Sequence, residues 1–313
     1  MQRLRRTKHY PIYLLGFILG FGQCSGQKHA PDWEDIPYAD DSLVGHRMDI
    51  YLPETGQASY PAVIIVYGSA FFGDDLKKTA FHTLGEPLLQ SGFAVVAVNH
   101  RSSRDAMFPA QIQDVKAAVR SIRARGTQFQ IDTSFIGITG YSSGGHLSAL
   151  AGTSGGVSHM ALGSESVDLV GEVGRNLGYS SSVDAVVDWF GPIDFPSMDS
   201  CGSSMVHNAP DSPESILIGG PIQDHRERCV LANPMTYIDG HDPPFLILHG
   251  DEDPLVPHCQ SAMLHEALKK AGVPSEYMLV PAAKHGPGLF EEKYFQEMCD
   301  FFLAVLKDKE KSQ

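Results

Sequence analysis

Short apolar runs recur along the chain, with more polar segments between them. Six of these runs have the length of a strand and are almost continuously apolar. They are residues 62–67 (AVIIVY), 94–98 (AVVAV), 135–139 (FIGIT), 185–190 (AVVDWF), 245–249 (FLILH) and 277–280 (YMLV). Runs of this kind are typical of central parallel strands that are covered on both faces of a sheet.

Segments with helical periodicity separate these runs. Between Ile112 and Ile122, for example, apolar side chains recur at steps of three, four and three residues. Residues 46–53 (HRMDIYLP) instead alternate in polarity, which predicts an antiparallel strand at the sheet edge. The alternation of strands and helices predicts an α/β fold with a doubly wound, mostly parallel sheet.

Residues 153–240 break this rhythm. The region holds one convincing strand and is rich in Gly, Ser, Pro and Asp. We interpret it as an insert, or cap, over the carboxyl ends of the strands, where open α/β sheets bind their ligands. With 313 residues, of which 42% are hydrophobic, the chain can bury one large core. We therefore expect a single domain over residues 27–313.

Residues 1–26 have the pattern of a secretory signal peptide. An apolar run over residues 12–21, too short to span a bilayer, follows a group of basic residues: Arg3, Arg5, Arg6 and Lys8. We predict cleavage near residues 22–26 and a secreted or periplasmic protein, with a buried N-terminal helix as the alternative. Lipid attachment at Cys24 is disfavoured, because Gln23 is large where a lipoprotein signal carries a small residue.

The charge and the cysteines narrow the range of partners and compartments. A formal net charge of −13 disfavours nucleic acid and anionic membranes as partners. Removal of Cys24 with the signal leaves an even number of cysteines. Cys201 and Cys229 bracket a Gly/Pro/Ser-rich stretch and are candidates for a disulfide. Cys259 and Cys299 have helical surroundings and are expected to be buried thiols, although spacing alone does not fix the pairing.

A serine interrupts the apolar pattern where the run 135–139 passes into a helix. Gly140-Tyr141-Ser142-Ser143-Gly144 fits G-x-S-x-G between a strand and a helix, which is the setting of a nucleophile elbow. The two glycines permit a sharp turn that presents the Ser142 hydroxyl. An ordinary glycine-rich turn is the alternative, but the chain lacks the G-x-G-x-x-G of a nucleotide-binding fold. Residues 152–156 share the spacing but follow a helix, so we interpret them as a loop.

A serine nucleophile needs a histidine base and a carboxylate that orients this base. In this fold the acid comes first along the chain and the histidine second, each after a late strand. The acid candidates are Asp251 and Asp253, and the base candidate is His285. No cofactor is expected, and no metal either, because His265-Glu266 lacks the second histidine of H-E-x-x-H.

Backbone N–H groups must also stabilise the negative charge that develops on the carbonyl oxygen of an ester. One donor is expected from Ser143, directly after the nucleophile. Ser69 and Ala70, in the loop GSAFFGDD after the first apolar run, are expected to supply the others. A plain turn is the alternative interpretation of this loop.

The chain resembles α/β-hydrolases of the hormone-sensitive-lipase-like group, and most closely their acetyl-xylan and feruloyl esterase branch. The similarity covers essentially all residues after the signal. It rests on FPAQIQDVKAAVRSIRARGTQFQID (108–132), ITGYSSGGHLSALAG (138–152) and NPMTYIDGHDPPFLILHGDEDPLVPHCQSAMLHEALKKAG (233–272). In that family H-G-x-x-D-x-x-V-P carries the acid at its aspartate, which implies Asp253, and the histidine motif matches at His285.

One segment departs from the family pattern. The family usually has His-Gly-Gly-Gly followed by an aromatic residue, where this chain reads Tyr67-Gly68-Ser69-Ala70-Phe71. Ser and Ala avoid positive φ. We therefore expect ordinary φ values in this loop if it is to keep its backbone donors in place.

The resulting hypothesis is a serine carboxylesterase with Ser142 as nucleophile, His285 as base and Asp253 as the orienting acid. The resemblance implies a small ester or an acylated oligosaccharide as substrate, with acetyl or hydroxycinnamoyl groups of plant cell walls. The candidate walls of the substrate pocket are Phe71, Tyr141, Trp189 and Phe190. A peptidase of the prolyl-oligopeptidase type and a non-catalytic binding module derived from a hydrolase are the alternatives.

Overall fold

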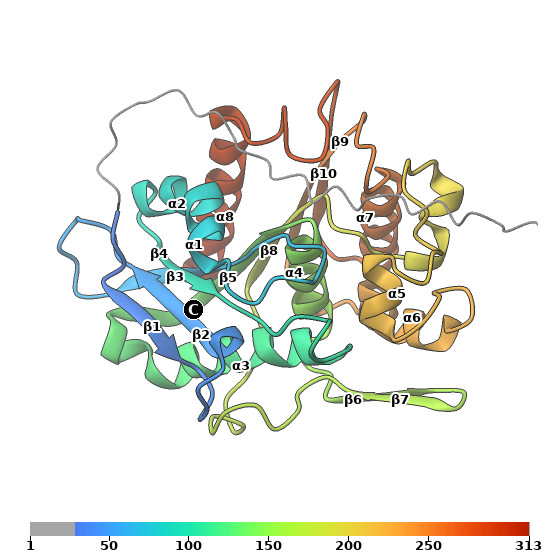
Figure 1. The fold of residues 1–313 in the computed structure, drawn as a ribbon. Helices are drawn as coiled ribbons and strands as arrows, with labels where there is room; N and C mark the ends of the chain where they lie inside the picture. Colours follow the sequence, from blue (N-terminus) through green and yellow to red (C-terminus); the bar gives the residue numbers. More distant parts are fainter. Residues whose placement is uncertain (1–28, 313) are drawn as a thin grey trace, which may run out of the picture. The chain divides into compact units, whose positions relative to one another are not determined.

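The computed structural model describes residues 29–312, and the chain from Pro31 onward forms one compact unit. The predicted signal peptide, residues 1–26, lies outside the described residues. An eight-stranded sheet forms the centre of the unit, in the order β1-β2-β4-β3-β5-β8-β9-β10 (Figure 1). Its strands are β1 (Trp33–Pro37), β2 (Arg47–Tyr51), β3 (Tyr60–Val66), β4 (Ala94–Val98), β5 (Ile131–Tyr141), β8 (Ala185–Trp189), β9 (Phe245–Gly250) and β10 (Ser275–Val280).

The pairing of the strands confirms the predicted α/β sheet. The strands β4, β3, β5, β8, β9 and β10 pair in parallel. They contain the six apolar runs except for Tyr67 and Phe190, which each follow their strand by one residue. Strands β1 and β2 add an antiparallel end to the sheet. The alternating segment 46–53 forms β2 as an antiparallel strand. Its expected place at the sheet edge is wrong, because β1 pairs with its outer side.

Helices cover both faces of this sheet, which explains why its interior strands β3, β4, β8 and β9 are almost entirely apolar. The helices are α1 (Lys77–Ala80), a π-helix (Phe81–Gly85), α2 (Glu86–Gln90), α3 (Ala110–Arg125), α4 (Ser143–Thr153), α5 (Pro213–Ile218), α6 (Arg226–Ala232), α7 (Cys259–Ala271) and α8 (Glu292–Ser312). Short 3₁₀ turns span Val44–His46, Gly126–Phe129, Phe195–Ser197, Asp199–Cys201 and Pro234–Tyr237.

Successive residues of a strand are buried in two separate hydrophobic cores, one on each face of the sheet. Ile64 belongs to the core that also contains buried side chains of α3, α4 and α7, whereas its neighbour Ile65 belongs to the core with buried side chains of α1, α2 and α8. Figure 1 shows α1, α2 and α8 on one side of the sheet and α3 on the other. Since neighbouring residues of a strand point to opposite faces, burial on both faces requires an apolar residue at nearly every position.

Strand β8 lies inside the sheet, between β5 and β9, and divides the region 153–240. The part before it carries a hairpin of β6 (His159–Leu162) and β7 (Glu165–Asp168), and the part after it carries α5 and α6. An ion pair of 2.9 Å between Glu165 and Arg228 joins the hairpin to α6. The region therefore consists of two segments, one before and one after an interior strand of the sheet.

The disulfide of the structure differs from the predicted one. Cys201 pairs with Cys259, at a Cα–Cα distance of 6.3 Å, so the predicted Cys201–Cys229 pair and the free thiol at Cys259 are both wrong. Cys229 is only 1% exposed on the inner side of α6, and burial raises the pKa of its thiol to about 12. Cys299 is a buried thiol, as predicted. The 3₁₀ turn that carries Cys201 packs beside the first residue of α7, a non-local contact that cysteine spacing does not reveal.

Candidate active site

Ser142 occupies a sharp turn between β5 and α4. Its backbone has φ 55° and ψ −125°, and its N–H donates to the carbonyl oxygen of Trp189 at 2.9 Å. Both flanking glycines are required by space. A Cβ at Gly140 would lie 2.4 Å from the Gly144 oxygen, and a Cβ at Gly144 would lie 2.2 Å from the Val66 oxygen. The turn holds the serine side chain at the carboxyl end of β5, in a strained conformation that larger neighbours would exclude.

The serine hydroxyl contacts a histidine, which in turn contacts an aspartate. His285 Nε2 lies 2.9 Å from Ser142 Oγ, and His285 Nδ1 lies 2.7 Å from Asp253 Oδ2. Asp253 follows β9, and His285 follows β10. Of the two acid candidates, Asp253 is therefore the one that contacts His285. Asp251 is exposed, and its carboxylate accepts the N–H of Ala282 at 2.6 Å.

The surroundings of Asp253 favour its ionised form. Burial by itself raises the pKa of this carboxyl group, but hydrogen bonds with His249 and His285 outweigh burial and hold the pKa well below its usual range. Its second oxygen accepts the N–H groups of Leu255 at 2.8 Å and Val256 at 3.0 Å. The carboxylate is thus charged at neutral pH and fixed at both oxygens, so it can orient the imidazole of His285.

The loop after β3 does not have the ordinary backbone that we expected. Ala70 and Phe71 have φ values of 52° and 63°, in the left-handed region, so the expectation of ordinary φ is wrong. The Ser69 N–H donates to the Ser143 hydroxyl at 2.9 Å, and this bond draws the loop against the start of α4. Among the described residues, the N–H groups of Ala70 and Ser143 have no acceptor. The geometry therefore offers Ala70 and Ser143 as free donors, whereas Ser69 is already engaged.

Side chains replace glycines as the means of holding this loop. The Tyr67 hydroxyl donates to the Gly73 oxygen at 3.1 Å, and the Gly73 N–H donates to Ser69 Oγ at 3.1 Å. The Tyr67 hydroxyl also accepts the N–H of His100 at 3.2 Å, which ties the loop to the segment after β4. Sequence comparison with the family motif marks Tyr67 as unusual, but it does not reveal these bonds.

Three of the four predicted pocket walls are core residues. Trp189 is fully buried, and Phe71 and Phe190 are each 1% exposed, so they have no surface for a substrate and this part of the prediction is wrong. Phe190 packs its ring against the His285 ring, with centroids 4.7 Å apart, and so supports the histidine. Tyr141 is half-buried, with its ring edge-on to Phe290, and stays a candidate for substrate contact. Aromatic residues at strand ends filled the core because neighbouring helices cover both faces.

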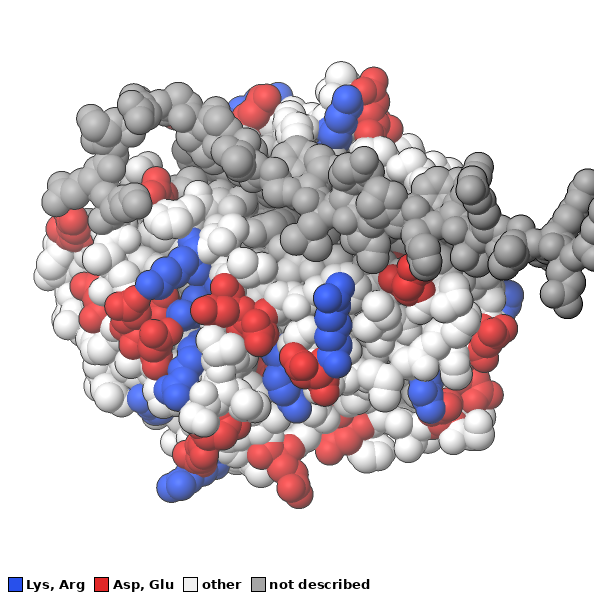
Figure 2. Space-filling model, in the orientation of Figure 1, with Lys and Arg blue, Asp and Glu red and all other residues white. Residues whose placement is uncertain are grey.

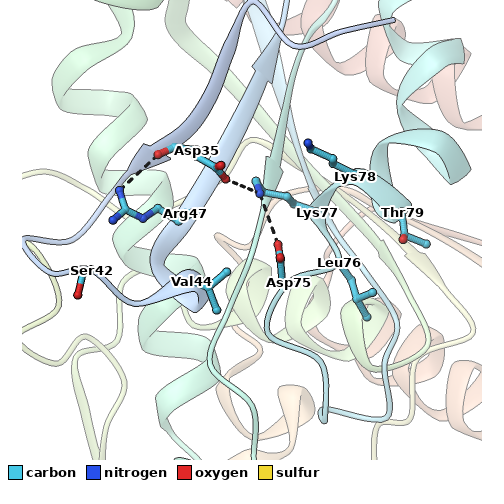
Figure 3. Close-up of a pocket in the computed structure, with 9 residues that line it drawn as sticks. All are labelled: Asp35, Ser42, Val44, Arg47, Asp75, Leu76, Lys77, Lys78 and Thr79. Atoms are coloured by element: carbon cyan, nitrogen blue, oxygen red, sulfur yellow. Dashed lines mark hydrogen bonds and ion pairs between the residues drawn. The ribbon is translucent and has the colours of Figure 1, made fainter. Parts of the chain in front are cut away.

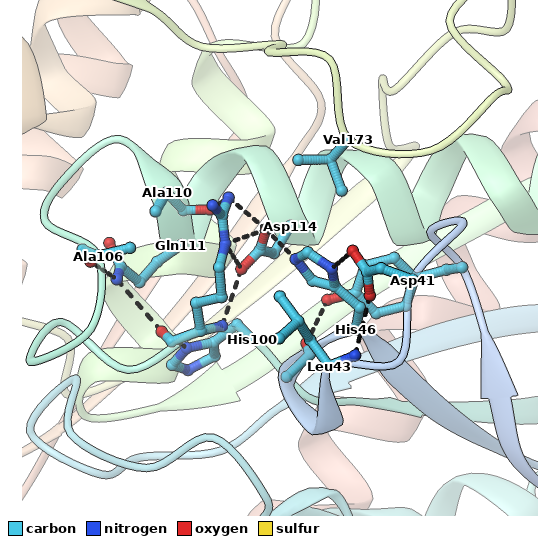
Figure 4. Close-up of polar contacts among 12 residues, drawn as sticks. Asp41, Leu43, His46, His100, Ala106, Ala110, Gln111, Asp114 and Val173 are labelled. Atoms are coloured by element: carbon cyan, nitrogen blue, oxygen red, sulfur yellow. Dashed lines mark hydrogen bonds and ion pairs between the residues drawn. The ribbon is translucent and has the colours of Figure 1, made fainter.

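A buried polar network supports the segment after β4 (Figure 4). Asp114, which is fully buried on α3, accepts hydrogen bonds from the Arg101 side chain and backbone and contacts His46 Nε2 at 3.0 Å. Burial alone would lower the pKa of His46, but the contacts with Asp114 and Asp41 raise it. Because His100 lies next to Arg101, the network fixes the partner of Tyr67 in place.

A charged cavity of about 510 Å³ is lined in part by residues 75–79, which follow the loop after β3 (Figure 3). The nearly buried Lys77 ammonium lies 2.7 Å from Asp35 and 3.5 Å from Asp75. The Asn99 side-chain oxygen accepts the N–H groups of Leu76 and Lys77. These contacts fix the far end of the loop, as Tyr67 and Ser69 fix its centre.

The described surface and helices add two observations. Figure 2 shows basic and acidic side chains interspersed on the visible face. Within residues 29–312, no helix is long and apolar enough to cross a membrane, and no cluster of His, Cys, Asp and Glu has the composition of a metal site.

Comparison with known proteins places this arrangement among ester hydrolases. Residues 48–268 match the model of the BD-FAE family. Esterase LipQ of Mycobacterium tuberculosis (strain ATCC 25618 / H37Rv) is 28% identical over 90% of this chain and 64% of its own length. Esterase LipC of the same organism is 29% identical over 74% of this chain and 54% of its own length. The chain thus spans less than two thirds of the length of these curated relatives.

Two solved structures are more similar. A truncated form of a carbohydrate esterase from gut microbiota is 46% identical, with a TM-score of 0.85, over 89% of this chain and 98% of that chain. A bifunctional GH43-CE protein of Bacteroides eggerthii is 51% identical, with a TM-score of 0.84, over 87% of this chain and 35% of that chain.

Proposed function

Since the chain belongs to the BD-FAE family of α/β-hydrolases, we propose that it is a serine carboxylesterase that removes acyl groups from plant cell-wall polysaccharides. The observation that carries this proposal is the continuous contact from Ser142 through His285 to Asp253. The similarity to carbohydrate esterases supports a carbohydrate as the alcohol part of the ester. Acetyl and feruloyl groups are the acyl parts that we propose.

The reaction begins when Ser142 Oγ attacks the ester carbonyl carbon. His285 Nε2 accepts the hydroxyl proton as the new C–O bond forms, and Asp253 stabilises the resulting imidazolium. The tetrahedral intermediate then collapses, and the imidazolium gives its proton to the leaving alcohol. Water, deprotonated by the same histidine, hydrolyses the acyl-enzyme and restores the serine.

The oxyanion of each tetrahedral intermediate needs donors that are already in place. The free N–H groups of Ser143 and Ala70 supply them, because the first belongs to the residue after the nucleophile and the second to the loop beside it. The amino end of α4 adds a favourable field at the same point, since the helix begins at Ser143. Ser69 contributes indirectly, by holding the loop against Ser143.

We also propose a secreted or periplasmic location. The basic group ahead of the short apolar run, residues 1–26, supports export. The Cys201–Cys259 disulfide supports an oxidising compartment, because disulfides are rare in reducing ones. Fractionation of the native host, with detection of the chain and its N-terminal residue, tests this location.

The function is tested by hydrolysis of 4-nitrophenyl acetate, methyl ferulate and acetylated xylan, with the Ser142→Ala variant beside the parent protein. We expect the parent to release product and the variant to lose almost all of this activity. The ratio of the rates on acetyl and feruloyl esters identifies the acyl group. Labelling of Ser142 by a phosphonate without turnover of any ester would keep the serine chemistry and reject the substrate. Absence of both labelling and turnover would favour a non-catalytic binding module, and cleavage of peptide bonds instead of esters would favour the peptidase alternative.

A further inference from the structure

A second group of a serine, a histidine and a carboxylate, separate from the proposed triad, is connected by successive contacts. Ser203 Oγ lies 2.9 Å from His207 Nε2, and His207 Nδ1 lies 2.9 Å from Glu214 Oε2. His207 is 2% exposed and Glu214 is 4% exposed. The distances match those of a catalytic triad, so the position of the protons decides what the group can do.

The positions of the protons on Ser203 and His207 exclude Ser203 as a nucleophile. Ser203 Oγ donates its only proton to the carbonyl oxygen of Leu255 at 2.8 Å and accepts the N–H of Met205 at 3.1 Å. His207 Nε2 faces Ser203 Oγ and, at 3.0 Å, the same carbonyl oxygen. Because both oxygens must accept from it, Nε2 carries a proton and has no lone pair with which to act as a base.

His207 Nδ1 faces Glu214 Oε2 at 2.9 Å, and we assign a proton to this nitrogen as well, so that His207 is an imidazolium that donates from both nitrogens. Burial alone would lower its pKa, but the contacts with Glu214 and with the Leu255 carbonyl oxygen raise it above the usual value. The backbone N–H of His207 donates to a second carboxylate, that of Asp199, at 2.7 Å. A buried cation with this set of acceptors is a fixed hydrogen-bond donor.

The carbonyl group that receives these bonds belongs to the loop of the triad acid. The Leu255 N–H donates to Asp253 Oδ1 at 2.8 Å, while the Leu255 oxygen accepts from Ser203 and His207. The preceding carbonyl, that of Pro254, accepts the N–H of Ser204 at 2.9 Å and its hydroxyl as well. Fixing the carbonyl oxygens on one side of the loop directs the amide hydrogens on the other side toward Asp253.

The disulfide completes the attachment of this segment. Cys201 begins the segment and is bonded to Cys259, the first residue of α7, which follows the acid loop along the chain. The loop is thus enclosed between a covalent bond on one side and the buried His207 on the other. An acid loop held in this way keeps the carboxylate at its distance from the imidazole, and displacement of a reacting group by about 1 Å costs up to about 100-fold in rate.

We propose that residues Cys201–His207 form an acid-loop clamp that holds Asp253 in position for catalysis, with His207 as a positioning residue. This inference rests on the proposed function, because it assigns a role to the clamp in the same serine chemistry. It predicts that changes in the clamp alter kcat and the pH profile, through Asp253 and His285, although the clamp does not contact the substrate.

The test compares two double variants that each remove the buried charges together, so that neither leaves an unpaired ion in the core. His207→Leu with Glu214→Leu removes every donor from position 207 to the Leu255 oxygen. His207→Gln with Glu214→Gln keeps an amide donor and an amide partner in place of the ion pair. The control is Arg228→Leu with Glu165→Leu, which removes an ion pair of 2.9 Å that does not contact the acid loop.

We expect the leucine pair to lower kcat by about 10-fold to 100-fold with little change in KM, and the glutamine pair to recover most of this loss. The acidic limb of the pH profile of kcat/KM should move to lower pH in the leucine pair, because a displaced Asp253 stabilises the His285 imidazolium less. The control should keep the parent profile. A purely structural role would lower the melting temperature without moving the acidic limb, and that result, or equal losses in the leucine and glutamine pairs, overturns the proposal.

Two further measurements separate this inference from the proposed function. If the leucine pair does not fold, Ser203→Ala removes one donor only, and we expect a several-fold loss of kcat with the same direction of pH shift. The rate of Ser142 labelling by a phosphonate replaces ester turnover if the parent hydrolyses none of the esters. Slower labelling of the variants then supports the clamp although the substrate is wrong, equal labelling overturns the clamp, and a parent that does not label overturns both proposals.

Discussion

Replacement of Tyr67 by phenylalanine tests how this chain holds an oxyanion loop without the usual glycines. The Tyr67 side chain is fully buried, and burial raises its pKa far above the usual value, so the phenol keeps its proton. That proton goes to the Gly73 oxygen, the nearer of two acceptors at 3.1 and 3.3 Å, and the phenol oxygen accepts the His100 N–H. Tyr67→Phe removes both hydrogen bonds and retains the ring, which stacks on His100 with centroids 4.7 Å apart.

The magnitude follows from those two bonds. A hydrogen bond of this kind contributes about 0.5 to 1.5 kcal/mol, so we expect the free energy of unfolding to fall by about 1 to 3 kcal/mol. The Gly73 carbonyl would then hold the loop less firmly, and the Ala70 N–H would lose part of its alignment. Complete loss of one oxyanion donor costs roughly 100-fold to 1,000-fold in kcat, so a displaced donor should cost about 10-fold, with KM unchanged.

Urea unfolding and initial rates on 4-nitrophenyl acetate measure the two effects, with Tyr60→Phe as the matched control. Tyr60 begins the same strand, is 2% exposed, and its hydroxyl accepts the Gln57 N–H at 2.8 Å and contacts Thr55 Oγ1 at 3.2 Å. The control therefore loses a similar set of bonds at the opposite end of β3. We expect a similar loss of stability in both variants and a loss of kcat only in Tyr67→Phe. Equal kcat values in the two variants would refute a positioning role for the Tyr67 hydroxyl.

Three further outcomes follow from the ionised groups. Asp253→Asn should lower kcat by about 10,000-fold in steady-state assays, because an amide does not hold the His285 tautomer that the reaction needs; a loss below about 100-fold contradicts the assigned acid. The pKa of Asp253 is held below its unfolded value, so its contribution to stability is complete above about pH 4 and is lost as the pH falls further. The melting temperature of the parent should therefore drop relative to Asp253→Asn below about pH 4, and parallel curves would show that the carboxylate has no such linkage. Asp114→Asn removes the buried carboxylate that contacts Arg101 and His46, and it should lower the free energy of unfolding in urea titrations by about 3 kcal/mol. A decrease below about 1 kcal/mol would mean that water replaces the carboxylate.

The parts of the fold that the sequence predicted are those that depend on local pattern. The run 94–98 forms β4 with the same bounds, because a central strand must be apolar at every position when both faces are covered. The elbow at Ser142 has the same character, since Gly140 and Gly144 are required by backbone contacts within a few ångströms. The strand can therefore be predicted from adjacent residues, and the elbow from its short motif, although the contact that requires Gly144 is with Val66 of β3.

The features that could not be predicted depend on contacts between distant segments. Spacing suggested Cys229 as the partner of Cys201, but α6 turns Cys229 into the core and α7 brings Cys259 to the turn at Cys201. Trp189 ends β8 and Phe190 follows it, yet both side chains are buried in the core that also contains side chains of α1, α2 and α8. Neither outcome has a signal in the residues next to these positions.

The loops of the proposed oxyanion donor and the proposed acid show the same division between reacting and positioning groups. In the first loop, side chains at 67 and 69 hold both backbone groups of Gly73; in the second, Ser203 and His207 hold the carbonyl of Leu255. The reacting groups need one particular chemistry at one point, which confines them to short motifs. A backbone carbonyl accepts any donor that reaches it, from any segment, so the residues that hold it are not confined to a motif. Motif matching therefore identifies Asp253 while it passes over His207, and variants at positioning residues are the measurements that show whether the geometry of these loops sets the rate.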